Sequence, residues 1–105
     1  MRETDGLALS SRNAYLSGQE RRIAPSLARV LRSVTSALTR QPGAVPAELA
    51  RGLRELRDAG FAIDYLEIRE EETLRPVTTM VAAPSRVFAA VHLGKTRLID
   101  NVPIV

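Results

Sequence analysis

Residues 86–104 read RVFAAVHLGKTRLIDNVPI, and this stretch decides the fold. Two runs rich in apolar and β-branched residues flank the pair Gly94-Lys95. A two-residue link that begins with glycine fits a type II′ turn, the kind that joins two antiparallel strands. The stretch therefore predicts a β-hairpin, and in its register His92 faces Arg97.

Upstream of the hairpin, the periodicity predicts a long amphipathic helix. Ser17 and Glu20 fit a capping box at its start. Apolar residues then recur every three or four positions to about Arg40, as a helix with one buried face requires. Pro25 lies in the second turn, where we expect a slight bend or a tight first turn rather than a break. The apolar positions are Ile23, Leu27, Val30, Leu31, Val34 and Leu38.

The rest of the chain completes an α+β fold. A second helix is predicted from about Pro46 to Gly60, after a short breaker that favours an antiparallel pair of helices. Residues 61–69, 86–93 and 96–104 are predicted strands. The expected architecture is two antiparallel helices packed on a small three-stranded antiparallel sheet.

Composition limits the class of protein. The chain has 105 residues, which is enough for one domain with its own core. It contains no cysteine, which excludes disulfides and is compatible with a cytoplasmic location. No run approaches the roughly 20 apolar residues that span a bilayer. We therefore expect a soluble domain.

The charge balance leaves a second function class open. The sequence pI is about 10.2, and Lys95 is the only lysine among 15 basic residues. The net charge is only +3, and four aromatic residues offer little for stacking on bases. A basic α+β module that binds nucleic acid or another acidic partner is the alternative hypothesis, and a dimerisation domain is a third. Several helical arginines have acidic neighbours and are interpreted as solvated surface: Arg29, Arg32, Arg40, Arg51, Arg54 and Arg57.

The most distinctive chemistry lies near the N-terminus, in residues 5–13. A short strand is expected around residues 7–9, and Ser10, Ser11 and Arg12 follow it. Hydroxyl groups donate single hydrogen bonds to phosphate oxygens, and arginine adds a planar charged fork. The positive end of the helix that follows is expected to add to the field. This loop is the candidate phosphate-binding site. The same run also fits an ordinary polar loop that leads into a helix, and Ser11 and Asn13 suit loop capping.

Three stretches resemble the C-terminal domain of the pantoate–β-alanine ligase (pantothenate synthetase) family in order and spacing. The resemblance runs from end to end of the chain, and its first stretch is highly specific. It implies a phosphate-binding segment over residues 1–16 and a lid domain over 17–105. The family's larger nucleotide-binding domain would lie upstream. The stretches are residues 2–16, 64–69 and 93–101.

The resemblance also implies a reaction and a set of site residues. Such ligases join pantoate to β-alanine through a pantoyl adenylate, using ATP and Mg²⁺ that are held mainly by the upstream domain. In that comparison Leu9, Ser10, Ser11 and Arg12 fall on the ATP-binding run, and the backbone of Met1 falls beside the adenine. Ser10 and Arg12 would be the catalytic pair that stabilises the leaving pyrophosphate. The full-length parent is expected to be a homodimer, and no metal ligand is expected in this chain.

Other polar residues have plainer interpretations. His92, the only histidine, is predicted to pack on the sheet surface without an acidic partner. Asp64 and Glu67 are expected on opposite faces of one strand, which argues against shared acid–base chemistry. Residues 70–72 are three glutamates and are interpreted as a solvated turn. Asp100, followed by an asparagine, is expected to end a strand or to pair with a neighbouring loop.

Overall fold

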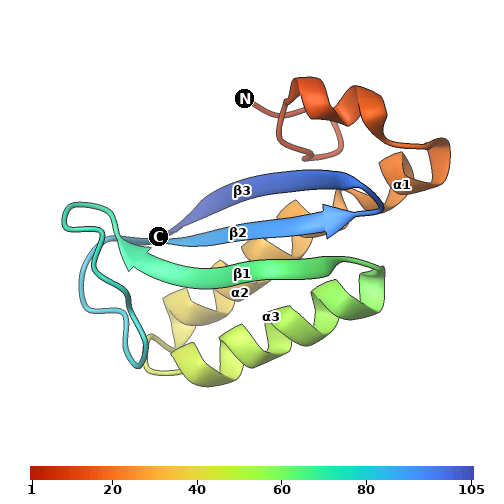
Figure 1. Ribbon diagram of the computed structural model, residues 1–105. Coiled ribbons are helices and arrows are strands. Elements are labelled where there is room, and N and C mark those ends of the chain that lie inside the picture. Colours follow the sequence, from red (N-terminus) through yellow and green to blue (C-terminus); the bar gives the residue numbers. More distant parts are fainter.

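The computed structural model describes all 105 residues, and its elements form two layers (Figure 1). One layer is the sheet, and the other contains the two long helices. The elements in chain order are the 3₁₀ helix η1 (Ser11–Tyr15), the helices α1 (Gly18–Ile23), α2 (Ser26–Arg40) and α3 (Val45–Ala59), and the strands β1 (Ala62–Glu70), β2 (Ser85–Leu93) and β3 (Thr96–Ile104). The predicted α+β class is confirmed.

The sheet is antiparallel with the strand order β1-β2-β3. The predicted hairpin joins β2 to β3, and His92 pairs with Arg97 as expected. Gly94 has a φ of +61° at the turn, a backbone angle that residues with a Cβ atom rarely adopt. β1 and β3 are therefore the two edges of the sheet.

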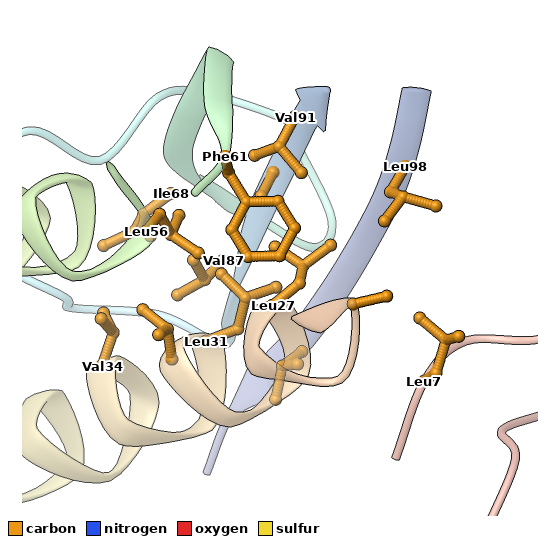
Figure 2. Close-up of a cluster of buried hydrophobic side chains, with 14 of the residues drawn as sticks. Leu7, Leu27, Leu31, Val34, Leu56, Phe61, Ile68, Val87, Val91 and Leu98 are labelled. Carbon is orange, nitrogen blue, oxygen red and sulfur yellow. The ribbon is translucent and has the colours of Figure 1, made fainter. Parts of the chain in front are cut away.

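The core lies between the sheet and the two long helices (Figure 2). Leu31 and Val34 of α2 are fully buried, as is Leu56 of α3. They meet the sheet face that carries Ile68 of β1 and Val87 of β2. Alternating residues of β2 and β3 thus turn inward, and the opposite face of the sheet carries no helix.

Gly52 allows α3 to approach its neighbours closely. A Cβ atom at this position would lie 2.9 Å from Cδ2 of Leu66 and 3.2 Å from Cγ2 of Val34. These two side chains come from β1 and α2, respectively. The glycine therefore lies at the point where three elements meet.

Two sequence predictions about the N-terminal third were wrong. The expected single helix is two helices, because Pro25 has no N–H and the α-helical assignment stops at Ile23 and resumes at Ser26. Ala24 and Pro25 keep right-handed helical angles, so the chain continues to turn there. The expected strand over residues 7–9 is a single bridge between Arg2 and Ala8.

A β-bulge in β1 overturned a third prediction. The register between β1 and β2 shifts between Ile63 and Tyr65, so Asp64 has no partner of its own. Asp64 now binds side chains on the helix-free face, the same face as Glu67. Strict alternation had placed these two carboxylates on opposite faces, and the extra residue removes that alternation.

None of the helices is both long enough and apolar enough to cross a lipid bilayer.

Candidate phosphate-binding site

The N-terminal segment is fastened to the edge strand β3 by one ion pair. Nη1 and Nη2 of Arg2 donate to the two carboxylate oxygens of Asp100, at 2.6 Å and 2.7 Å. The Asp100 side chain is only 6% exposed, whereas that of Arg2 is 30% exposed. Asp100 thus pairs with a neighbouring loop, one of its two predicted roles, and it lies within β3 rather than at the end of the strand.

A second set of contacts closes the segment on itself. Gly6 takes a φ of +93° at the turn that reverses the chain, and Leu7 is buried beside the core. Figure 2 shows Leu7 at the margin of that cluster. Arg21 of α1 donates to Asp5 at 2.6 Å and to Glu3 at 3.0 Å. The bond from Arg21 lowers the pKa of Asp5, so this carboxylate stays ionised.

The predicted phosphate-binding residues lie on the exposed end of this fastened segment. Oγ of Ser10 accepts the backbone N–H of Arg12 at 3.1 Å, which makes Ser10 the N-cap of η1. Ser11 and Arg12 follow on the first turn of η1, and both are exposed. The Arg12 guanidinium forms no ion pair or hydrogen bond within the chain. It is therefore available to a ligand.

Asn13 serves the loop itself. Its Nδ2 donates to Oε2 of Glu3 and to the carbonyl oxygen of Ala8, both at 3.0 Å. These bonds tie η1 to the closed segment before it. Of the two roles that the sequence leaves open for Asn13, the contacts support loop capping.

Arg12 lines a pocket that the hairpin completes. The pocket has a volume of about 610 Å³, and it lies between η1 and the turn from β2 to β3. Three of its side chains are cationic, and none is acidic. The lining residues are Arg12, Tyr15, Lys95, Thr96 and Arg97.

Arg97 is oriented by the bulge in β1. Its Nε donates to Oδ2 of Asp64 at 2.8 Å, and this bond lowers the pKa of Asp64. The two terminal nitrogens of Arg97 have no partner within the chain. His92 Nε2 also lies 3.3 Å from Oδ2 of Asp64, so the prediction that His92 has no acidic partner was wrong.

The other predicted residues lie apart from this pocket. Met1 and Leu9 line a second pocket of about 490 Å³ beside β3, together with Arg2 and Arg32. Leu9 donates its backbone N–H to the carbonyl oxygen of Met1 at 3.1 Å. The structure thus brings Met1 and Leu9 together, and it places Arg12 in a different pocket.

The start of α1 does not offer the positive end that the sequence suggested. The Ser17 side chain accepts the N–H of Glu20, and the Glu20 carboxylate accepts the N–H of Ser17. This capping box is confirmed as predicted. Because a carboxylate already occupies the helix N-terminus, little of the helix field remains for a ligand.

Sequence reasoning missed two residues of the basic pocket, Lys95 and Arg97. One signal was present, because Lys95 is the single lysine of an arginine-rich chain and lies at a hairpin turn. The proximity of Lys95 to Arg12 is a tertiary effect that no local pattern reveals.

Comparison with known proteins identifies the family of this chain. The model of the family described as Pantoate-beta-alanine ligase matches residues 1–103. The chain belongs to the pantoate–β-alanine ligase family. It is 49% identical over 104 residues to the pantothenate synthetase of Bradyrhizobium sp., covering 99% of this chain and 36% of that protein. The pantothenate synthetase of Rhodospirillum rubrum is 49% identical over 105 residues, which cover 99% of this chain and 37% of that protein.

Solved structures of the ligase family share the fold. The pantothenate synthetase of Thermus thermophilus superposes with a TM-score of 0.85 at 43% identity, covering 99% of this chain and 37% of that one. The ligase of Francisella tularensis, complexed with Beta-gamma ATP and Beta-alanine, superposes with a TM-score of 0.62 at 26% identity. The match covers 98% of this chain and 30% of that one. The chain therefore spans 30–37% of the length of these family members.

Proposed function

We propose that this chain is the C-terminal lid of an ATP-dependent pantoate–β-alanine ligase and contacts the phosphates of ATP. The observation that carries the proposal is the unpaired Arg12 guanidinium, which faces a basic pocket at the end of a fastened segment. Family membership supplies the reaction. In that reaction pantoate and ATP give pantoyl adenylate and pyrophosphate, and the amine of β-alanine then releases AMP and forms pantothenate.

Arg12 and Ser10 have distinct roles in the proposed adenylation. Negative charge grows on the pyrophosphate as the pantoate carboxylate attacks the α-phosphorus. Arg12 would stabilise this charge, because a guanidinium donates two parallel bonds to phosphate oxygens. The Ser10 hydroxyl accepts from the backbone of η1 and keeps its own proton free to donate to a phosphate oxygen.

The lid would also exclude water. An acyl adenylate hydrolyses readily, so closure over the nucleotide protects it until β-alanine arrives. The ion pair from Arg2 to Asp100 fixes the loop to the domain, so that loop and domain would move as one body. Met1 and Leu9 would then meet the nucleotide from the second pocket, with the backbone of Met1 beside the adenine.

Mg²⁺ does not fit the residues of this chain. No group of three or more His, Cys, Asp or Glu side chains is close enough to hold a metal ion. The pocket around Arg12 is cationic and would repel a divalent ion that lacked its own anions. The metal, and most of the ATP, would be bound by the remainder of the parent enzyme. The same proposal makes that parent a cytoplasmic homodimer.

The test is pyrophosphate release by the full-length parent in the presence of pantoate and ATP. Arg12→Ala should lower the rate by about 10²–10³, as expected for losing a charge-stabilising donor. Arg22→Ala is the matched control, because Arg22 is an exposed arginine outside both pockets. An active wild type with an unimpaired Arg12→Ala variant would reduce the loop to a structural element.

The alternative function, binding of nucleic acid or another acidic partner, has weaker support. Arg51 is already paired with Glu48 and Glu55 on α3, which leaves less free positive charge on that helix. An inactive parent together with salt-dependent binding of RNA or DNA fragments by this chain would favour the alternative.

A further inference from the structure

We propose that Lys95 and Arg97, at the turn between β2 and β3, form the second wall of a polyphosphate site whose first wall is Arg12. The proposal rests on the proposed function for the identity of the reaction. It assigns binding residues outside the N-terminal loop, on an element about 80 residues away in the sequence. The ligand class is a chain of two or three phosphates.

The pocket is cationic and has the size of a ligand site. Arg12, Lys95 and Arg97 line one pocket, and no carboxylate lines it with them. A volume of about 610 Å³ falls within the range of small-molecule sites, 300–1,000 Å³. Three cationic side chains that line one pocket of this size suit an extended polyanion better than a single phosphate ion.

The three cationic side chains keep nitrogen atoms free for an anion. Neither Arg12 nor Lys95 forms an ion pair within the chain, so binding an anion breaks no existing pair. Arg97 is held by its Nε on Asp64, and its terminal nitrogens remain free. Asp64 is thus a positioning residue, because it fixes the guanidinium plane and the bulge places it there.

The pocket also contains groups for directional hydrogen bonds. Tyr15 is 78% exposed, and its phenol can donate to a phosphate oxygen. Thr96 is nearly buried at the base of the hairpin, beside the exposed Lys95. The Glu20 side chain of α1 reaches this turn, because a Cβ atom at Gly94 would lie 2.2 Å from its Oε2.

The first experiment titrates inorganic pyrophosphate, and separately inorganic phosphate, into this chain by calorimetry and two-dimensional NMR. We expect saturable shifts in η1 and at residues 94–97, with pyrophosphate binding more tightly than phosphate. Lys95→Gln should weaken pyrophosphate binding roughly tenfold, the loss of one exposed charge-assisted contact. Lys95→Arg should retain binding, and Arg22→Gln should leave it unchanged.

The second experiment uses the full-length parent and separates this inference from the proposed function. Lys95→Gln should raise the inhibition constant of pyrophosphate and the KM for ATP roughly tenfold, with little change in the KM for pantoate. An active parent that keeps both constants after Lys95→Gln would overturn the inference and leave the proposed function intact. An inactive parent, with pyrophosphate binding by this chain that depends on Lys95, would overturn the function and leave the polyphosphate site. Equal binding by wild type and Lys95→Gln would also overturn the inference.

Discussion

Replacement of Arg2 by alanine is the most informative perturbation of this domain. It removes two short hydrogen bonds to a carboxylate that is 6% exposed, so Asp100 is left charged and nearly buried. Hydrogen bonds to charged groups contribute about 1.5–3 kcal/mol each, and breaking a buried pair costs about 3–5 kcal/mol. Arg2 is partly exposed and Asp100 keeps the N–H of Asn101 at 2.8 Å, which lowers the expected cost to about 2–3 kcal/mol.

Asp100→Asn should cost less, about 1–2 kcal/mol, because the charge left behind belongs to Arg2, which reaches water. Urea unfolding measures both variants. For a domain of this size, Arg2→Ala should lower the midpoint by about 1–2 M. The loop should loosen as well, so the amide of Leu9, bonded to the carbonyl of Met1, should exchange faster with solvent. Arg22→Ala is the control. Two results would contradict this prediction: a urea midpoint of Arg2→Ala equal to that of the control, or a lower midpoint for Asp100→Asn than for Arg2→Ala.

Further predictions concern the core, the glycine contacts and pH. Leu31→Ala should lower the free energy of unfolding by about 2–5 kcal/mol in urea, because Leu31 is fully buried. Gly52→Ala should leave the free energy of unfolding nearly unchanged, because a gain of about 1 kcal/mol in helix propensity offsets a close contact that the end of the Leu66 side chain can relieve. Gly52→Val should lower the free energy of unfolding by about 1–3 kcal/mol. Equal effects of the two variants would contradict the close packing. The bond from Arg97 lowers the pKa of Asp64 below its ordinary value of 3.8, so the pair stabilises the fold above that pH and the contribution disappears as the pH falls below it. In the Asp64→Asn variant the urea midpoint of unfolding should therefore fall less steeply as the pH is lowered below that value. An unchanged pH dependence would contradict this assignment.

Local rules predicted the parts of the fold that depend on neighbouring residues. The hairpin register follows from a glycine at one turn position, and the capping box from two side chains three residues apart. Pro25 perturbs the helix more than local rules predicted, because it divides the expected helix into α1 and α2. One missing N–H was enough to end α1 after six residues.

The sequence did not predict the features that need contacts between distant residues. The bulge at Asp64 contains no glycine or other signal, so strict alternation gave the wrong face. The acidic partner of His92 was missed for the same reason. The basic pocket requires η1 to lie beside the hairpin turn, and only the folded chain brings Arg12 and Lys95 together. The chemistry of Ser10 and Arg12 indicated a phosphate-binding loop, and the resemblance to a family assigned that loop to ATP. Their role in catalysis stays a prediction.

The pairing of Arg2 with Asp100 has a consequence for biosynthesis. The two residues are 98 positions apart, and at about 5–20 residues per second the ribosome needs roughly 5–20 s to make the chain between them. Throughout that interval the segment that carries Ser10 and Arg12 exists without its anchor on β3. The first part of this domain to be translated is thus among the last to reach its final position. A ribosome that stalls before β3 would leave this segment exposed to proteases and unable to dock.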